Sequence, residues 1–437
     1  MRALAGPVTP LSVDATWFLR GSDNATDYGV STPLVKEATP SNLGEPASES
    51  RRPTPGTGPK SSPAGTGAVR HRFTSVAERG GMRIALVTEA FYPAVDGTTR
   101  TVKAVADRLV DTGHEVGIVA PGPGLETYRR SRVVRVSGRE RLGSRVREVL
   151  TDLRPDLVHV TSPGALGRKA LKHAVRLGIP TVVVEQSPVL DPGADHWRAK
   201  VADRADTLLV TAPWMLDRAR ELGADPVLWS PGVDTVAFNP ALRDRWLHGS
   251  WSRSASAREP LVTVGFVGSL EACQGVRRLA ELAAVPGIRP VVIGEGSMRR
   301  WLTSRLPAAR FTGTLETGAL TVALASLDLL VHPGEQETCC HALREAAASG
   351  TPVVAPRSGG ATDVVRSLET GLLYDPAEAR GLRQAVAAVA ADPHRALLGA
   401  RARELALGRG WQEAVDELVE RHHRPLVRRG SRIPAAA

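Results

Sequence analysis

The chain has 437 residues, of which 42% are hydrophobic, and a chain of this length can bury two hydrophobic cores. No apolar run in the sequence reaches the roughly 20 residues that a bilayer-spanning helix needs. The cysteines are too few for a disulfide framework, and Pro7 and Pro10 interrupt the N-terminus, which does not resemble a signal peptide. We therefore expect a cytoplasmic protein.

The formal net charge of +10 raises the question of nucleic-acid binding. Only six of the 56 basic residues are Lys, and this bias fits a GC-rich coding sequence as well as it fits a ligand. Aromatic residues make up only 4% of the chain, and it has no helix-turn-helix, zinc-finger or aromatic RNA-binding motif. We do not expect nucleic acid as a partner; a nucleic-acid binder would show an affinity that falls steeply with salt.

Residues 1–81 form a tract rich in Pro, Gly, Ser and Thr with almost no periodic apolar pattern. Such a segment buries too little apolar surface to offset the entropy of ordering its backbone, so we expect it to be disordered. An alternative is that the tract is not naturally translated, because the first strand pattern begins directly at Met82.

From Met82 onward, short apolar runs alternate with helical patterns, which is typical of an α/β protein. A helix is predicted over Thr99–Thr112, with Gly113 at its C-terminal cap. Residues 82–245 are assigned to a first Rossmann-like domain. Its predicted strands cover Ile84–Thr88, Val116–Ala120, Leu157–Val160, Thr181–Val184 and Thr207–Thr211.

The segment Pro240–Ser256 is predicted to link this domain to a second one, over residues 256–410. Residues 411–437 are predicted to form a terminal helix, Trp411–Arg421, that packs back toward the first domain, and a basic tail that we expect to be disordered. The predicted strands of the second domain are Val262–Val267, Pro290–Ile293, Asp328–His332 and Pro352–Ala355.

Two carboxylates stand eight positions apart in the run from His332 to Gly360: Glu337 before a predicted helix and Glu345 inside it. Three alanines follow Glu345, so helix propensity does not explain the carboxylates. If the whole segment is helical, eight residues rise about 12 Å, which is roughly the distance from a sugar across a diphosphate to a ribose. A helix N-terminus between them would suit phosphate. The alternative is a solvated acidic turn followed by a surface helix.

The run resembles the E-x7-E signature of the retaining, family-4 glycosyltransferases, and in particular the GDP-mannose-dependent α-mannosyltransferases. Further motifs in family order strengthen the resemblance: MRIALVTEAFYPAVDGTTRTV from Met82, RPDLVHVTSP from Arg154, PGVDTVAFNP from Pro231, VGFVGSL from Val264 and VVIGEGSMRRWL from Val291. The resemblance implies the GT-B fold, in which two Rossmann-like domains face a central cleft. It also implies transfer of a hexose, mannose by resemblance, from a nucleoside diphosphate sugar to a lipid or glycan acceptor.

The resemblance assigns roles to individual residues. Glu337 would contact the donor sugar and is the candidate catalytic residue, whereas Glu345 would hold the ribose hydroxyls. Thr338 would cap the helix or bind phosphate through its N–H, and His341 would bind or pack as a neutral ring. We expect neither a metal nor a cofactor. GDP-mannose is the expected donor substrate. The other expected donor-binding residues are Gly97, Gly268, Ser269, Gln274, Gly294, Glu295, Gly296, Cys339 and Cys340.

The chain departs from the family where the diphosphate should bind. Ser269 and Gln274 replace an Arg and a Lys that clamp the diphosphate in the family, and Arg277 and Arg278 lie close by in sequence as partial substitutes. On the acceptor side, Glu185-Gln186-Ser187-Pro188 replaces Tyr-Gln-Thr-Asp. These changes keep a second hypothesis open, in which the protein is a catalytically impaired paralogue that acts as a binding or regulatory protein.

The segment Tyr128–Glu148 carries eight arginines against two glutamates. Anionic lipid headgroups attract such clusters by about 1 kcal/mol per basic residue. One hypothesis is therefore a peripheral position at the inner face of the membrane, with an anionic membrane surface as a partner. The alternative is a merely solvated basic face.

Overall fold

The computed structural model describes residues 80–430 except 95, 137–140, 190–192 and 255–258, and the described residues belong to one compact unit. The tract expected to be disordered therefore lies outside the described residues, apart from its last two positions. Within the described parts, no helix has both the length and the apolar character that crossing a membrane takes.

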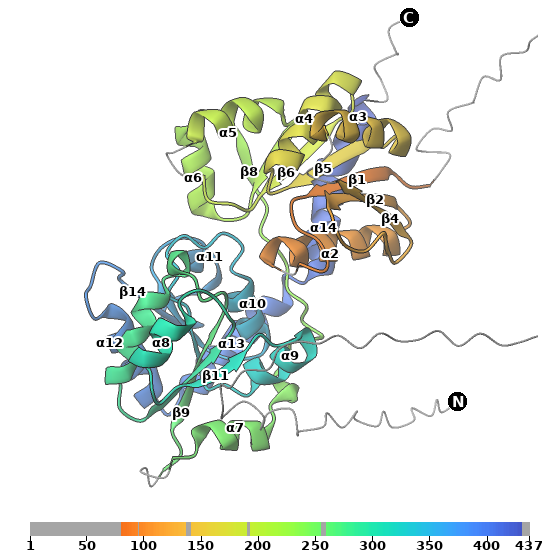
Figure 1. Cartoon of the computed structure of the whole chain (residues 1–437). Helices are drawn as coiled ribbons and strands as arrows, with labels where there is room; N and C mark the ends of the chain where they lie inside the picture. The colour runs from red at the N-terminus through yellow and green to blue at the C-terminus, as the bar shows by residue number, and fades with distance from the viewer. Residues whose placement is uncertain (1–79, 95, 137–140, 190–192, 255–258, 431–437) are drawn as a thin grey trace, which may run out of the picture. The chain divides into compact units, whose positions relative to one another are not determined.

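The first half of the described chain forms an eight-stranded sheet with the strand order β3-β4-β2-β1-β5-β6-β7-β8 (Figure 1). All neighbouring strands pair in parallel except β3 and β4. The strands are β1 Arg83–Thr88, β2 Glu115–Pro121, β3 Thr127–Tyr128, β4 Ser131–Val136, β5 Leu157–Thr161, β6 Thr181–Glu185, β7 Thr207–Val210 and β8 Pro226–Leu228. The helices are α2 Gly97–Asp111, α3 Leu142–Leu153, α4 Ala165–Leu177, α5 Ala194–Lys200 and α6 Pro213–Glu221, with short 3₁₀ turns at Ala202–Arg204 and Pro240–Leu242.

Helix α2 begins where its sequence supplies a cap. The carboxylate of Asp96 accepts a hydrogen bond from the backbone N–H of Thr99 at 2.7 Å, which satisfies one of the free donors of the first turn. The face of α2 with Val102, Val105 and Leu109 is buried against the sheet core. These interactions fix the first turn of α2 beside the carboxyl end of β1, where an α/β sheet binds its ligand.

The second half forms a six-stranded parallel sheet with the order β11-β10-β9-β12-β13-β14. Its strands are β9 Val262–Val267, β10 Ile288–Ile293, β11 Arg310–Gly313, β12 Leu329–Val331, β13 Val353–Pro356 and β14 Gly371–Tyr374. Its helices are α7 Arg245–Ser252, α8 Arg299–Arg305, α9 Thr317–Ala325, α10 His341–Ala348, α11 Ala361–Val364, α12 Gly381–Ala391 and α13 Arg395–Leu407, with 3₁₀ segments η4 Ala272–Gln274 and η5 Val276–Ala284. The expectation of two Rossmann-like domains is thus confirmed.

Each predicted strand is present, and five further strands escaped prediction: β3, β4, β8, β11 and β14. Four of them are only two to four residues long, too short for a periodic signal. The fifth, β4, carries Arg132 and Arg135 among its valines. The segment expected to be a linker contains α7, whose Leu247 and Trp251 are buried as the helix packs against β9 and β10.

The C-terminal helix packs on the first sheet, as predicted. It runs through α14 Trp411–Leu418, a π-helical turn Val419–His423 and α15 Arg424–Gly430. Ala414, Val415 and Leu418 join the core of β1, β2 and α2 (Figure 1), and the indole Nε1 of Trp229 donates to Ala414 O at 2.9 Å. The expectation of a disordered tail from Arg421 was wrong up to residue 430, because the buried Val427 anchors this last stretch.

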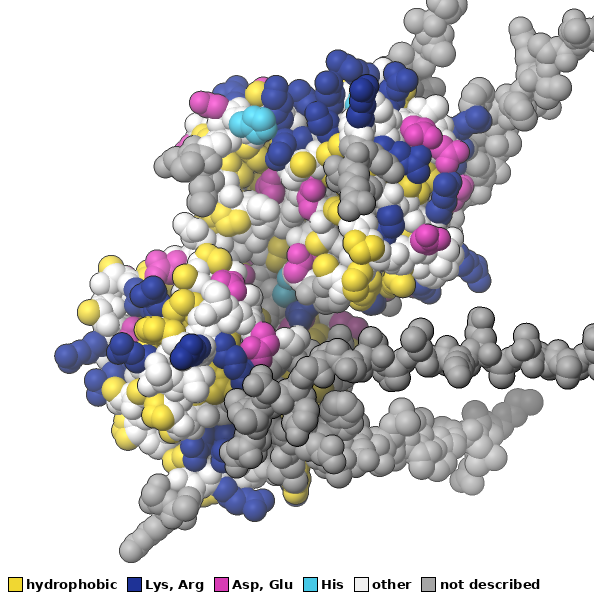
Figure 2. All heavy atoms as spheres, in the orientation of Figure 1, with side chains coloured by type: hydrophobic (Ala, Val, Ile, Leu, Met, Phe, Trp, Pro, Cys, Tyr) yellow, Lys and Arg dark blue, Asp and Glu magenta, His cyan; other side chains and the backbone are white. Residues whose placement is uncertain are grey.

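Lys and Arg side chains gather on the surface around α3 and α4 of the first domain (Figure 2). The positive charge of Arg176 and, to a smaller extent, that of Lys169 lower the pKa of Lys172.

Two buried histidines hold the C-terminal helix to the sheet. Nδ1 of His159, on β5, lies 3.0 Å from Nε2 of His423, and both rings are almost fully buried. Burial lowers the pKa of His159 to about 4 and that of His423 well below its ordinary value, which the neighbouring His159, His422 and His114 lower further. The pair is therefore neutral in the folded protein at pH 7.

We expect acid to destabilise the protein through this pair. The histidines take up protons in the unfolded chain below pH 6.5 but resist them when folded, so their contribution to stability is lost as the pH falls from 6.5 toward 4. Replacing both (His159→Leu with His423→Leu) should reduce the difference in Tm between pH 7.5 and pH 5 by at least about 2 °C, because roughly 1 kcal/mol shifts Tm by about 2–4 °C. The exposed His394 (His394→Leu) serves as the control. An unchanged pH dependence in the double variant would contradict this role.

Candidate active site

The E-x7-E segment lies at the carboxyl end of β12, between that strand and α10. Helix α10 begins only at His341, so Glu337 stands in the loop before it and Glu345 within it. The condition for the 12 Å estimate, a helix over the whole segment, is therefore not met. Cys340 is the residue that precedes the first turn, with a left-handed φ of 52°. Thr338 does not cap the helix, because its Oγ1 donates to Gln186 O at 2.6 Å instead.

Glu337 is ionised by its surroundings. Its Oε1 lies 3.2 Å from Nε2 of His332, and its side chain is 20% exposed. Burial raises the pKa of Glu337, but the neighbouring His332 ring outweighs burial, and the net pKa lies below its ordinary value. A carboxylate held charged at a loop is suited to accept hydrogen bonds from sugar hydroxyls.

Glu345 is buried and paired with a cation from the other domain. Its Oε1 accepts a hydrogen bond from Nη1 of Arg100 at 2.6 Å. Its Oε2 has no hydrogen-bond partner among the described residues. Burial raises the pKa of Glu345 to about 7, and the charge and hydrogen bond of Arg100 oppose this rise. The free oxygen is the kind of acceptor that a ribose hydroxyl requires.

His341 joins the start of α10 to the start of α2. Its Nε2 lies 3.1 Å from Gly97 O and 3.3 Å from Oγ1 of Thr101. Burial lowers the pKa of His341 to about 3, and Arg100 and Arg344 lower it too, so the ring is neutral. A Cβ on Gly97 would come within 3.2 Å of the His341 ring, which leaves little room for any other residue there. Of the two roles expected for His341, binding or neutral packing, this geometry fits neutral packing.

Further contacts connect the segment to the first domain. The indole Nε1 of Trp214, on α6, donates to Glu337 O at 2.8 Å. The thiol of Cys339 lies 3.7 Å from Oγ1 of Thr211, just after β7. Burial raises the pKa of both Cys339, to about 11, and Cys340, so both thiols are neutral and pack in the protein interior. The E-x7-E segment is thus held against loops that follow β6 and β7.

The glycine loops of the second sheet are closely packed. A Cβ on Gly294, whose φ is 138°, would lie 1.9 Å from Gly268 O, so these two loops approach backbone to backbone. A Cβ on Gly275 would lie 2.4 Å from Pro333 O, which places the end of η4 against the loop after β12. Glu295 pairs with Arg299 on α8. The structure therefore brings Gly268, Gly294, Gly296 and Gln274 to one edge of this sheet, together with the E-x7-E loop.

No cation takes the place of the expected clamp in the loop after β9. Ser269 is exposed, and Gln274 ends η4. Arg277 lies over the ring of Trp301, 5.7 Å from its centroid. Arg278 donates to Pro376 O and lies 3.4 Å from Glu335. Both arginines are therefore engaged elsewhere, and neither substitutes for the missing pair in this structure.

Models of two families match the chain: Glycosyltransferase Family 4 over residues 95–236 and Glycosyl transferases group 1 over residues 250–405. A GDP-mannose-dependent α-mannosyltransferase of Mycolicibacterium smegmatis is 37% identical over 380 residues, covering 80% of this chain and 100% of the relative. The enzyme of the same name from Corynebacterium glutamicum is 32% identical, over 81% of this chain and 91% of the relative. The chain belongs to the family-4 glycosyltransferases.

Solved structures agree with this assignment at the level of the fold. Sucrose-phosphate synthase from Thermosynechococcus elongatus has a TM-score of 0.66 at 19% identity and covers 79% of this chain and 99% of its own. Anabaena Alr3699/HepE in complex with UDP has a TM-score of 0.66 at 18% identity and covers 78% of this chain and 100% of its own. The protein is a glycosyltransferase with the GT-B fold.

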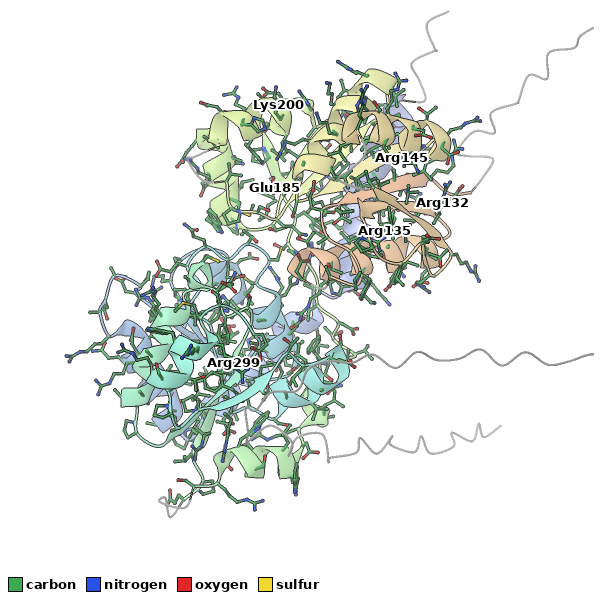
Figure 3. All side chains as sticks on the ribbon, in the orientation of Figure 1. Arg132, Arg135, Arg145, Glu185, Lys200 and Arg299 are labelled. Atoms are coloured by element: carbon green, nitrogen blue, oxygen red, sulfur yellow. The ribbon has the colours of Figure 1, made fainter. Side chains whose placement is uncertain are left out.

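At the carboxyl end of β6, this glycosyltransferase has a buried carboxyl group. Glu185 is the last residue of β6 (Figure 3), where its Oε2 accepts from Nε1 of Trp197 at 2.8 Å and its Oε1 from the backbone N–H of Ser187 at 3.0 Å. Burial raises the pKa of Glu185 to about 7. The amide of the next residue, Gln186, is buried and has no partner among the described residues.

Three residues with contacts at these positions were not predicted from the sequence: Arg100, Trp197 and Trp214. Arg100 could have been found, since it stands three positions after Gly97 within the DGTTRTV motif. The two tryptophans lie outside the motifs that carry the family resemblance, so no sequence pattern marked them. Their roles depend on the tertiary structure that brings their indole N–H groups to carboxylate or carbonyl oxygens.

We expect the two glutamates to differ in what they bind. Glu345→Gln should weaken the binding of bare GDP about tenfold or more, because a hydrogen bond to a charged group contributes about 1.5–3 kcal/mol. Glu337→Gln should leave GDP binding within about twofold and weaken GDP-mannose instead. Calorimetry with both ligands measures this, with the exposed Glu316 (Glu316→Gln) as the control. Equal losses of GDP affinity in both variants would refute the division.

Proposed function

We propose that this glycosyltransferase moves mannose from GDP-mannose to a lipid or glycan acceptor, with retention of the anomeric configuration. The observation that carries the proposal is the 37% identity over the full length of a GDP-mannose-dependent α-mannosyltransferase. The placement of Glu337 and Glu345 on either side of the α10 N-terminus supports it. Three substrate parts, the sugar, the diphosphate and the ribose, then each have a chemically suitable partner.

The proposed mechanism uses binding and electrostatics rather than a protein nucleophile. Glu345 holds the ribose, and the charged Glu337 orients the mannose. The first turn of α10 has no side-chain cap, so its free N–H groups and the positive end of its helix dipole are suited to the diphosphate. Attack on the same face, assisted by the leaving phosphate, gives retention. Stabilising the charge that develops on GDP as it departs is then the main catalytic task.

The alternative hypothesis, a catalytically impaired binding protein, is not favoured. The relatives that match over most of this chain are named as transferases. Both carboxylates of the E-x7-E motif are present, and one of them keeps a free oxygen.

We expect the purified protein to release GDP from GDP-mannose in the presence of octyl α-mannoside, a soluble mimic of a glycolipid acceptor. Glu337→Gln should lower the rate by about tenfold or more, while Glu316→Gln should not change it. The one-bond C1–H1 coupling of the newly formed glycosidic linkage, measured by NMR, should be that of an α-mannoside. Faster turnover of GDP-glucose or UDP-glucose would contradict the proposed donor, and a β-product would contradict retention.

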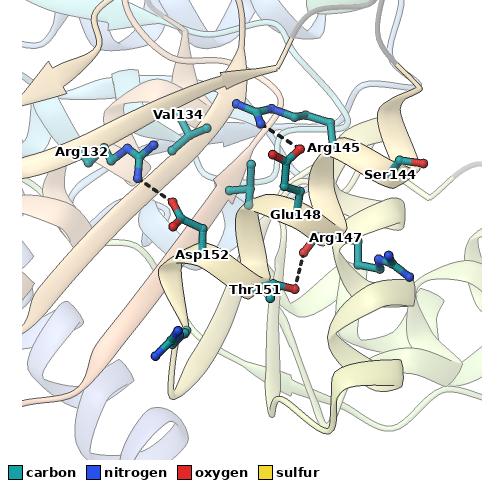
Figure 4. Close-up of a pocket in the computed structure, with 10 residues that line it drawn as sticks. Arg132, Val134, Ser144, Arg145, Arg147, Glu148, Thr151 and Asp152 are labelled. Atoms are coloured by element: carbon teal, nitrogen blue, oxygen red, sulfur yellow. Dashed lines mark hydrogen bonds and ion pairs between the residues drawn. The ribbon is translucent and has the colours of Figure 1, made fainter. Parts of the chain in front are cut away.

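The arginine-rich surface of the first domain supports a membrane-facing acceptor. A pocket of about 820 Å³ lies between β4 and α3 and is lined by Arg132, Arg145, Arg147 and Arg154 (Figure 4). Arg132 pairs with Asp152 at 2.7 Å and Arg145 with Glu148 at 3.0 Å.

Two other arginines of the segment have structural roles. Arg135 donates to three backbone carbonyl oxygens, and Arg129 pairs with Asp107 and Asp111. We propose that Arg132, Arg145 and Arg147, together with Arg154 just after α3, contact an anionic membrane.

Binding to phosphatidylglycerol vesicles should exceed binding to phosphatidylcholine vesicles and should fall with salt, because exposed charges are screened beyond about 8 Å at physiological ionic strength. Arg147→Gln with Arg154→Gln should reduce it severalfold. The control is the same charge loss at two exposed residues of the second domain, Arg300→Gln with Arg310→Gln. Salt-independent binding, or equal losses in both pairs, would contradict a membrane-binding surface here.

A further inference from the structure

The second domain has few cations left to bind a diphosphate. Besides Arg277 and Arg278, two arginines flank the E-x7-E loop. Arg344 pairs with Asp363 at 2.9 Å and donates to Cys339 O. Arg357 donates to Leu373 O. Arg278, Arg344 and Arg357 are thus engaged with oxygens of their own domain, and Arg277 lies over the Trp301 ring. The loop after β9 offers only the neutral Ser269 and Gln274.

The first domain does place a cation beside the E-x7-E segment. Arg100 lies in the first turns of α2, three residues after Gly97, the residue expected to face the diphosphate. Its Nη1 lies 2.6 Å from Oε1 of Glu345, and its side chain is 37% exposed, so a ligand can reach it. The neighbouring Thr101 contacts His341, which fixes this turn of α2 against the start of α10.

The partner of Arg100 is the carboxylate that the nucleotide requires. If Glu345 holds a ribose, as the proposed function states, the two ribose hydroxyls compete with Arg100 for its oxygens. A guanidinium that loses its carboxylate in a partly buried place is destabilised unless another anion replaces it. The diphosphate is covalently joined to that ribose, and phosphate is a geometrically matched partner for the guanidinium fork.

We propose that Arg100 is the diphosphate-binding cation of this enzyme. It pairs with Glu345 when the donor site is empty and moves to the donor phosphates when the ribose takes Glu345. This inference rests on the proposed function. It also accounts for the neutral Ser269 and Gln274, since the positive charge comes from the first domain instead of from the loop after β9.

The test compares guanosine and GDP, which share the ribose and differ in the diphosphate. Calorimetry on Arg100→Gln should show GDP affinity reduced about tenfold or more, while guanosine binds as well as before or more tightly because Glu345 is released. Arg100→Lys should recover part of the GDP affinity. The matched control is Lys103→Gln, which removes a charge from the same helix at a residue that pairs with Asp107.

A second arm adds Ser269→Arg with Gln274→Lys. In the Arg100→Gln background this pair should restore GDP affinity, and in the native background it should add clearly less, because both sets of charges serve one diphosphate. Equal gains in the two backgrounds would contradict the inference.

Two results overturn the proposal in distinguishable ways. If the native protein binds GDP and Arg100→Gln binds it equally well, or gains affinity for GDP and guanosine alike, Arg100 only blocks Glu345 and the inference alone fails. If the native protein binds neither guanosine nor GDP, the proposed donor fails, and the inference fails with it.

Discussion

The ion pair between Arg100 and Glu345 is the interaction that joins the E-x7-E segment to the first domain. A carboxylate buried inside a helix requires a partner, because an isolated buried charge is strongly destabilising. Here the partner is Arg100 on α2, so a helix of the first domain is joined to α10 of the second domain. His341, Thr338 and Trp214 add hydrogen bonds around the same place. The E-x7-E segment is therefore positioned by both domains rather than by its own helix.

Two buried glutamates, Glu185 and Glu345, lower the stability of the folded protein. Burial raises the pKa values of Glu185 and Glu345 to about 7 from an ordinary 4.5. Because the unfolded carboxyl groups release their protons at lower pH, these two residues make folding less favourable as the pH rises from 4.5 to 7. Groups with such perturbed pKa values cluster at functional sites. Glu185 and Glu345 are therefore candidate functional groups of this glycosyltransferase.

Much of the fold could be predicted from the sequence, because strands buried on both faces leave continuous apolar runs such as that of β1. Short strands such as β14 and the buried tail around Val427 could not, since their stability comes from tertiary packing. At the site, the motifs placed Glu337 and Glu345 in sequence but not in space. The start of α10 at His341 and the reach of Arg100 to Glu345 depend on contacts between the domains, which local patterns do not encode.

A crystal structure of the protein with GDP bound tests the account most directly. The account predicts that both ribose hydroxyls lie within hydrogen-bond distance of the Glu345 carboxylate and that the guanidinium of Arg100 contacts a phosphate oxygen. A structure in which Arg100 still pairs with Glu345 while the nucleotide binds elsewhere, or in which the phosphates are held only by groups of the second domain, would contradict it.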